Sequence, residues 1–398
     1  KTKIINKLID LELSIYNSSN FLNSLISDES SLDFNSLDNL TLIGRNEIVP
    51  NQSLLRKNIF NKSILVTGAG GSIGSELVRQ ITRLKPSKLI LLDNNEFALY
   101  KINKDLNNNY SQMNSKIEIV SLLGSIVDKD RMSYILEKYN PFVIFHAAAY
   151  KHVSIVEENP GEGVKVNVFG TKNLLHLLEK YSIKNFILVS TDKAVRPPNI
   201  MGATKRISEQ LVQLESNVNL KTKFSIVRFG NVIGSSGSVI PIFSEQIKSG
   251  GPITVTHKDT TRYFMTIPEA AQLILQAGGL PEKGSVYVLD MGVPLNILSI
   301  AKRMIKLSGL SIKNEKNING DIEIIFTGLK QGEKMHEELS LDGNFFKTKH
   351  PSIKRVNEEF MPTKDLNKEL NKLMIMIAKN HNAGIIKLIK KIVPEYNN

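Results

Sequence analysis

Short apolar runs alternate with longer segments of helical periodicity along the chain from Ser63 onward. The predicted strands are Ser63–Thr67, Lys88–Leu92, Ile117–Leu122, Phe142–Phe145, Phe186–Val189 and Phe224–Arg228. The predicted helices between them are Ile73–Leu84, Glu96–Leu106, Lys129–Lys138, Val164–Lys180 and Met201–Leu214. Buried strands that alternate with helices predict an α/β fold, a doubly wound parallel sheet of the Rossmann type.

The pattern loosens after Gly230 and predicts a second, smaller lobe. Glycine- and serine-rich turns there separate a strand at Ile253–Thr256, helices at Pro268–Gln276 and Ile297–Leu307, and a strand at Ile322–Phe326. We therefore expect four parts: a lead-in segment at 1–60, a dinucleotide-binding Rossmann domain at 61–232, a mainly substrate-binding lobe at 233–345 that interleaves with this domain, and a helical extension at 346–398.

Composition narrows the class of protein. The 398 residues are 41% apolar and 23% charged, which indicates a soluble globular chain long enough for two domains. The net charge of +12 favours an acidic partner, but the lysines are spread out and aromatic residues make up only 7%, so we expect no nucleic acid. The absence of cysteine excludes thiolate chemistry and fits a reducing cytoplasm. No apolar run approaches the ~20 residues that span a bilayer.

A glycine-rich loop follows the first predicted strand. Such a turn lets the backbone approach a pyrophosphate while the next helix directs its first amides at the phosphates. A glycine loop can also serve chain reversal alone, but its place between a strand and a helix matches the dinucleotide-binding fingerprint. The predicted contacts in this loop are Gly68, Gly70, Gly71, Ser72, Ile73 and Gly74.

Further predicted cofactor contacts stand where later strands end, because these ends meet at one edge of a parallel sheet. Asp93 ends the second strand, where a carboxylate accepts hydrogen bonds from both ribose hydroxyls and repels a 2′-phosphate. Asn94 supplies no cation for such a phosphate, so the sequence favours NAD over NADP. The alternative is that Asp93 is a solvated turn residue. Ala147 and Ala148 follow the fourth strand.

A polar triplet, Thr191, Asp192 and Lys193, follows the strand Phe186–Val189, and Lys205 lies on the next helix. An acid and a base beside a nicotinamide ring can move protons as well as a hydride. That is more than a simple oxidation needs.

Five motifs resemble those of one family. Together, and in their order along the chain, these motifs resemble those of the extended, nucleotide-sugar branch of the short-chain dehydrogenases/reductases. The resemblance covers the chain from about Lys62 to Leu339. Within that branch they resemble the configuration-retaining UDP-N-acetylglucosamine 4,6-dehydratases that serve bacillosamine and capsule synthesis. The motifs are His146-Ala147-Ala148-Ala149-Tyr150-Lys151-His152-Val153, Ser190-Thr191-Asp192-Lys193-Ala194, Arg228-Phe229-Gly230-Asn231-Val232, Thr261-Arg262-Tyr263-Phe264-Met265-Thr266 and Gly332-Glu333-Lys334.

The resemblance implies a redox cycle with NAD, in which a hydride leaves C4 of the sugar, water is eliminated across C5 and C6, and the hydride returns to C6. In this cycle Thr191 hydrogen-bonds the C4 oxygen, and a protonated Asp192 helps the C6 hydroxyl to depart. A neutral Lys193 accepts the C5 proton, and Lys205 grips the nicotinamide ribose. Burial shifts both pKa values in the required directions. The alternative is an ordinary surface ion pair between Asp192 and Lys193.

Two positions depart from the family pattern. Met201 stands where the family usually has a catalytic tyrosine, and a thioether relays no proton. Some membrane-associated dehydratases share this substitution, so it does not exclude activity. Without the tyrosine, the C4 hydroxyl proton needs another acceptor, and we expect Lys193 or Asp192 to take it. Ser125, followed by Ile126, stands where an aspartate usually contacts the adenine, and serine still accepts one hydrogen bond.

The resemblance also implies a UDP-sugar site in the second lobe, since arginine and lysine suit a diphosphate. The alternative for Arg262, Lys330, Lys151 and His152 is that each is an ordinary solvated charge. His152 has no second ligand at metal-binding spacing, so no metal is expected. The predicted substrate contacts are Lys151, His152, Thr191, Asn231, Arg262, Lys330 and Glu333.

Two other functions stay open: a nucleotide-sugar 4-epimerase on the same scaffold, and a non-catalytic NAD-sensing module. Because family members associate through helices such as Val164–Lys180 and Met201–Leu214, we expect a homo-oligomer, a dimer or larger. They often carry transmembrane helices ahead of a segment like Leu42-Ile43-Gly44-Arg45, and Lys1 is not a methionine start. We therefore expect a cytoplasmic catalytic part, tethered to the inner face of a bacterial inner membrane by a preceding segment.

Overall fold

The computed structural model describes residues 48–110, 117–280, 282 and 284–397. The chain divides into two compact units built from separated segments. The sheet unit contains Ile48–Phe229, Ile267–Asp290 and Glu338–Asn398. The lobe contains, among the described residues, Gly230–Thr266 and Met291–Glu337.

The sheet unit is organised around a nine-stranded sheet in the order β15-β16-β11-β6-β5-β4-β1-β2-β3. The seven strands from β11 to β3 are parallel, and β16 and β15 extend one side in antiparallel pairing. The order 3-2-1-4-5-6 is that of a doubly wound sheet, so the predicted α/β fold is confirmed. The strands are β1 Ser63–Thr67, β2 Lys88–Asp93, β3 Glu118–Leu123, β4 Val143–His146, β5 Asn185–Val189, β6 Lys223–Arg228, β11 Ser285–Leu289, β15 Phe346–Lys347 and β16 Ile353–Val356.

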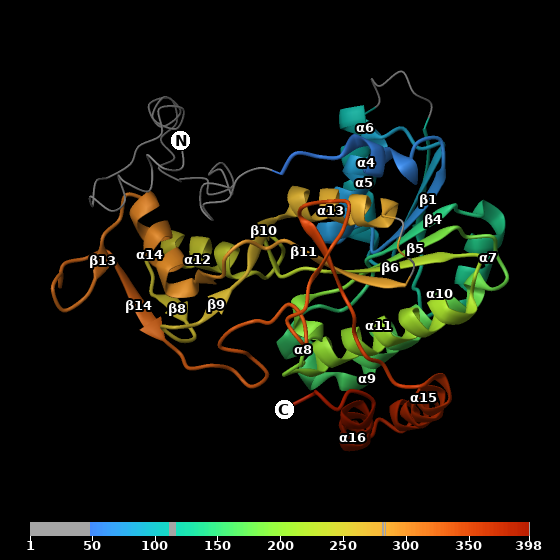
Figure 1. Cartoon of the computed structure of the whole chain (residues 1–398). Coiled ribbons are helices and arrows are strands. Elements are labelled where there is room, and N and C mark those ends of the chain that lie inside the picture. The colour runs from blue at the N-terminus through green and yellow to red at the C-terminus, as the bar shows by residue number, and fades with distance from the viewer. Residues whose placement is uncertain (1–47, 111–116, 281, 283, 398) are drawn as a thin grey trace. The chain divides into compact units, whose positions relative to one another are not determined.

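Helices cover both faces of this sheet (Figure 1). Parallel strands buried on both faces are almost continuously apolar, as in β1, where Ile64, Leu65 and Val66 are fully buried. One face carries α4 Gln52–Lys57, α5 Ser72–Arg83, α6 Glu96–Tyr110 and α13 Ile267–Gly279. The other carries α7 Lys129–Tyr139, α10 Thr171–Leu178 and α11 Ile200–Val218, with α8 Val153–Glu158 and α9 Pro160–Val164 beside α11.

The predicted single helix Val164–Lys180 is interrupted. Its first part is the end of α9, then a π-helix runs over Lys165–Gly170, and α10 follows. Within this π-helix, the side chain of Asn167 accepts a hydrogen bond from the backbone amide of Tyr150 and donates one to its carbonyl. Helical interruptions of this kind are frequent near functional sites.

Helix α11 is buried along most of its length. The C-terminal helices α15 Thr363–Ala378 and α16 Asn382–Ile392 pack outside it, with Ile385, Ile389 and Ile392 in the core of the sheet unit. Helix α11, through which we expected subunits to associate, is thus largely covered within one chain.

The lobe has a small core of its own. Helices α12 Val239–Lys248 and α14 Ile297–Leu307 pack on a three-stranded sheet of β13 Ile312–Lys313, β14 Ile322–Phe326 and β8 Ile253–Val255. Phe243, Ile253 and Met304 are among the buried residues of this core. Two strand pairs complete the lobe: β7 Asn231–Ile233 with β10 Phe264–Thr266, and β9 Thr261–Arg262 with β12 Leu295–Asn296.

The division into units differs from the predicted ranges in several segments. Residues 267–290, predicted within 233–345, belong to the sheet unit, because β11 pairs with β6 and α13 covers the sheet. Residues 338–345 and the extension 346–398 also belong to the sheet unit, and 230–232 to the lobe. Of the lead-in 1–60, residues 1–47, which include Leu42–Arg45, lie outside the described residues. The rest docks on α13, where Asn58 donates to the carbonyl of Gly278 at 2.6 Å.

Candidate active site

The glycine loop between β1 and α5 is shaped by contacts that tolerate no side chain. Gly68 has a φ of +68°, and a Cβ there would lie 2.7 Å from the amide nitrogen of Ala148. A Cβ on Gly74 would overlap the carbonyl oxygen of Gly68. Gly71 is the N-cap of α5 and makes no side-chain cap hydrogen bond, and the first turn of a helix is a favourable place for an anion.

Asp93 braces this loop. Its Oδ2 accepts a hydrogen bond from the amide of Gly70 at 2.8 Å, and its Oδ1 accepts from the amide of Asn95 at 2.9 Å. Each carboxylate oxygen keeps a second lone pair, so both can also accept from a ribose hydroxyl. Asp93 is buried rather than solvated, and Asn94 beside it is exposed.

His146 ends β4 and is pinned between two hydroxyls, a role that the sequence analysis missed. Its Nδ1 lies 2.8 Å from Thr67 Oγ1 and its Nε2 lies 3.0 Å from Thr171 Oγ1. Burial, and then the nearby Lys205 ammonium, lower the pKa of His146 to about 3, so the ring is neutral. The strand therefore ends rigidly where Ala147 and Ala148 meet the glycine loop.

The two predicted adenine contacts differ in exposure. Ser125 is partly exposed, and its Oγ accepts a hydrogen bond from the amide of Val127 at 3.2 Å. Ile126 is buried against Gly170, where a Cβ would lie 2.5 Å from its Cδ1. Of the two side chains, only that of Ser125 remains accessible.

The polar triplet forms one connected group at the end of β5. Asp192 Oδ1 accepts from Thr191 Oγ1 at 2.9 Å and lies 3.1 Å from Lys193 Nζ. The Asp192 side chain is 0% exposed and that of Lys193 is 20% exposed. The carboxylate of this pair is therefore buried, and the lysine is partly exposed. The protonation states required of it stay a prediction.

Helix α11 begins against this triplet. Its N-cap Asn199 accepts from the amide of Gly202 at 2.7 Å, and a Cβ on Gly202 would overlap the carbonyl oxygen of Lys193. Met201 is 4% exposed and packs in the hydrophobic core, as expected of a side chain that relays no proton. Burial lowers the pKa of Lys205 to about 8, against the opposite effect of Glu209.

Asn167 is a second residue that the sequence analysis missed. Its Oδ1 accepts from the amide of Tyr150 at 2.8 Å, and its Nδ2 donates to the Tyr150 carbonyl at 3.0 Å and to Thr204 Oγ1 at 2.9 Å. It thus ties the segment after β4 to α11. The available signal was an asparagine inside an apolar helical run, a place that disfavours this residue.

The predicted substrate residues are divided between the units. Lys151 and His152 lie exposed in the sheet unit at the start of α8, and partial burial and then the Lys151 ammonium lower the pKa of His152. Asn231, Arg262, Lys330 and Glu333 lie in the lobe.

Arg262 is the centre of the lobe's polar cluster. Its Nη2 donates to Glu333 Oε1 at 2.8 Å, and its Nε lies 3.6 Å from Glu337 Oε1. Lys330 joins through its amide, which lies 3.4 Å from Glu333 Oε2, while its side chain is exposed. The Asn231 amide donates to the carbonyl of Tyr263, the residue after Arg262, at 2.9 Å.

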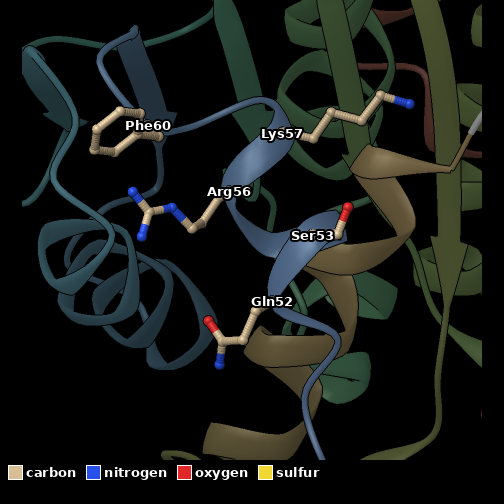
Figure 2. A pocket seen from close by; sticks show the side chains of 5 residues that line it. All are labelled: Gln52, Ser53, Arg56, Lys57 and Phe60. Atoms are coloured by element: carbon tan, nitrogen blue, oxygen red, sulfur yellow. The ribbon is translucent and has the colours of Figure 1, made fainter.

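A pocket beside α4 contains none of the predicted site residues. Figure 2 shows its lining, Gln52, Ser53, Arg56, Lys57 and Phe60, with the Arg56 guanidinium 4.3 Å from the centre of the Phe60 ring. Within the described ranges, no group of three or more histidine and carboxylate side chains is placed to hold a metal ion. No helix of the part that the structure describes has the length and apolar character to cross a membrane.

Fold and site together define an α/β protein with a dinucleotide-type glycine loop and a Thr-Asp-Lys triplet around a buried Asp192 at the same sheet edge. Residues 64–358 match the family model described as polysaccharide biosynthesis protein, and the chain belongs to this family, within the extended short-chain dehydrogenases/reductases.

Three curated relatives illustrate the range of the family. The chain is 45% identical to the capsular polysaccharide biosynthesis protein CapD of Staphylococcus aureus over 84% of this chain and 54% of that protein. It is 31% identical to a UDP-N-acetylglucosamine 4,6-dehydratase (inverting) of Campylobacter jejuni, covering 76% and 86%. It is 29% identical to a UDP-glucose 4-epimerase of Rickettsia bellii, covering 70% and 77%. The chain spans about half the length of CapD.

Two solved structures share the fold. Pen from Bacillus thuringiensis superposes with a TM-score of 0.67 at 30% identity, over 77% of this chain and 89% of that one. The dTDP-glucose 4,6-dehydratase DesIV from Streptomyces venezuelae, with NAD and DAU bound, gives a TM-score of 0.58 over 70% and 88%. At 21% identity the second shows the shared fold alone.

Proposed function

We propose that this chain is the catalytic part of an NAD-dependent UDP-N-acetylglucosamine 4,6-dehydratase. The observation that carries this proposal is the triplet at the end of β5, in which a fully buried Asp192 contacts both Thr191 and Lys193. The product is the 4-keto-6-deoxy sugar nucleotide, UDP-2-acetamido-2,6-dideoxy-hexos-4-ulose. The similarity to the Campylobacter dehydratase supports this reaction class.

The cofactor is NAD. The residues fit it, because the glycine loop forms a cradle that a Cβ on Gly68 or Gly74 would fill, and Asp93 offers acceptors beside it. The remaining contacts are those predicted from the sequence: Gly70, Gly71, Ser72, Ile73, Asn94, Ser125, Ile126, Ala147, Ala148 and Lys205. When bound, NAD accepts and returns one hydride.

The triplet moves the protons. Lys193 takes the proton from C5, Asp192 gives one to the departing C6 hydroxyl, and Thr191 orients the C4 oxygen. Asp192 Oδ1 and Lys193 Nζ lie 3.1 Å apart. Transfer of one proton from the lysine to the carboxylate therefore converts the ionised pair into the neutral pair. The elimination requires the neutral pair, and this protonation state is part of the proposal. Since Met201 relays no proton, Asp192 takes the C4 hydroxyl proton as a carboxylate and then gives this proton to the departing C6 hydroxyl, while Lys193 returns its proton to C5 after the hydride reaches C6.

The lobe binds the UDP part of the substrate. Arg262 has a planar guanidinium group whose donors match a diphosphate. Asn231, Lys330 and Glu333 are the other substrate contacts that we propose in the lobe. Lys151 and His152 serve the sugar. The protein retains the C5 configuration, works as a homo-oligomer and is tethered at the inner face of the bacterial inner membrane. These three statements rest on the resemblance alone.

A 4-epimerase is the second candidate, favoured by the similarity to the Rickettsia enzyme. Epimerisation at C4 has no use for an acid and a base at C5 and C6. The buried Asp192–Lys193 pair therefore favours dehydration. The buried Met201 is the observation that favours a non-catalytic NAD-binding module.

Incubation of the chain with NAD and UDP-N-acetylglucosamine in deuterated water separates these functions. We expect a product lighter by one water, with deuterium at C5, detected by mass spectrometry and NMR. Asp192→Asn and Lys193→Met should each lower turnover by about 100-fold or more, the usual contribution of a general acid or base. A product of unchanged composition indicates an epimerase, and bound NAD without conversion of any UDP-sugar indicates the module.

A further inference from the structure

Four charged side chains form a buried charge cluster behind the triplet: Glu209, Arg228, Glu358 and Arg206. Arg228 donates from Nε and Nη2 to the two oxygens of Glu209 at 2.7 and 2.6 Å, and from Nη1 to Glu358 Oε1 at 2.6 Å. Arg206 lies 3.3 Å from Glu209 through its Nη1. Arg228 ends β6, Glu209 and Arg206 lie on α11, and Glu358 follows β16.

Glu209 and Arg228, at the centre of the cluster, stabilise each other's charged forms. Burial alone would raise the pKa of Glu209, but Arg228 and then Arg206 hold it below its usual value. Glu209 and Glu358 raise the pKa of Arg228 despite its burial. Arg228 and Arg206 offset the charges of the buried carboxylates of Glu209 and Glu358, and the loss of one partner leaves a buried charge uncompensated.

One hydroxyl connects this cluster to the triplet. Ser190 donates from Oγ to Glu209 Oε1 at 2.6 Å, and it is the residue before Thr191. The same turn is held by the amide of Ser190 on the Val227 carbonyl at 2.7 Å and by the amide of Asp192 on the Phe229 carbonyl at 3.0 Å. Both carbonyls flank Arg228. The cluster therefore fixes the turn that carries the acid and the base.

The C-terminal extension holds the other side of the cluster. Besides Glu358, the backbone of this extension contacts α11: Gln213 Nε2 donates to the Glu358 carbonyl at 3.2 Å, and Gln210 Oε1 accepts from the Met361 amide at 3.1 Å. Arg206 donates to the carbonyl of Glu359 and lies 3.1 Å from Glu395. Residues late in the chain thus reach Ser190 through two ion pairs.

We propose that Glu358, Arg228 and Glu209 act as positioning residues that fix Ser190, and with it the Thr191–Asp192–Lys193 turn, so that the C-terminal extension controls turnover without touching the reactants. This proposal rests on the proposed function. None of these residues is assigned a chemical step, and one of their links to the turn, the hydrogen bond from Ser190 to Glu209, can be removed by itself.

Ser190→Ala removes that hydrogen bond and leaves the four charges in place. We expect kcat to fall about tenfold with KM nearly unchanged, because small displacements of reacting groups are costly. The backbone amide of Asp192 should exchange with deuterium faster than in the parent, measured by hydrogen-exchange mass spectrometry. Ser216→Ala is the matched control: it deletes a buried hydroxyl on α11 that donates to the Gln213 carbonyl of the same helix at 2.8 Å.

Ser190→Thr keeps the hydroxyl and should restore kcat toward the parent value, and Glu358→Gln should lower kcat in the same direction as Ser190→Ala. The proposal is overturned if Ser190→Ala matches Ser216→Ala in both kcat and exchange, or if kcat falls only in step with the loss of folded protein. A parent without turnover of UDP-N-acetylglucosamine refutes the proposed function instead. In that case, the amide exchange rates of Ser190→Ala and Ser216→Ala test the positioning role without a kinetic measurement.

Discussion

Two arginines, one in each unit, contact two glutamates each, but in different ways. In the sheet unit, Arg228 is fully buried and uses three nitrogens on the carboxylates of Glu209 and Glu358 at 2.6 to 2.7 Å. In the lobe, Arg262 makes one carboxylate contact at 2.8 Å and a looser one at 3.6 Å. Its closer partner, Glu333, is 25% exposed.

The difference separates a structural arginine from one that can receive a ligand. The carboxylates around Arg228 are shielded from water, so nothing can exchange with them without unfolding. Water reaches Glu333, and a phosphate oxygen can replace a partly solvated carboxylate on the same guanidinium. Burial of the partner, rather than of the arginine itself, distinguishes the two sites.

The largest expected effect is on stability. Arg228→Met should lower the free energy of unfolding by about 3–5 kcal/mol, because it leaves two carboxylates buried without their guanidinium. Arg262→Met is the matched variant and should cost clearly less, since water can hydrate Glu333. Urea unfolding followed by circular dichroism measures both losses. Equal losses would contradict the distinction between the two sites.

A second test concerns a buried cation that lacks the close carboxylate contacts of Arg228. The pKa of Lys205 is lowered from 10.5 to about 8, so between these pH values the folded protein binds fewer protons than the unfolded chain. Stability from this group is complete above pH 10.5 and is lost as pH falls through 8. The parent should therefore gain about 3 kcal/mol over this window relative to Lys205→Met.

The measurement for Lys205 is the urea midpoint from pH 8 to 10.5 in parent and variant. Exchange of an exposed lysine, Lys221→Met, serves as the control and should keep the slope of the parent. A Lys205→Met variant whose stability follows the same pH slope would show that burial does not act on this ammonium.

The smallest effect is expected for Arg262→Lys. Lysine keeps the charge but loses the planar fork, so KM for the UDP-sugar should rise about tenfold while kcat stays within about twofold. Steady-state kinetics with UDP-N-acetylglucosamine measure both constants. A fall in kcat at constant KM would place Arg262 with the reacting groups instead of the diphosphate.

Local features of the sheet unit could be predicted from the sequence. Strands β1, β2 and β4 are almost continuous apolar runs, because both faces are covered, and the glycine loop and the triplet stand directly at strand ends. The predicted helix Val164–Lys180 overlaps an observed helical stretch from Pro160 to Leu178, but a π-helix at Lys165–Gly170 interrupts it, and Asn167 within this π-helix bonds the backbone of Tyr150, 17 residues away.

Long-range features could not be predicted in this way. Strand β11 has an apolar sequence, but its place beside β6 is visible only once the chain is known to return from the lobe. The buried charge cluster gives no local signal either, because Arg228 finds its partners 19 and 130 residues away. Each of these side chains, taken alone, has the composition of an ordinary surface charge.

The late position of Glu358 has a consequence for synthesis on the ribosome. When β6 emerges, Arg228 can meet Glu209 at once, but its second partner is made 130 residues later. Until then the guanidinium lacks one of its neutralising groups, and the neighbouring strands β11 and β16 do not yet exist. The sheet unit is therefore completed after translation of most of the chain, and contacts so distant in sequence make its folding slow.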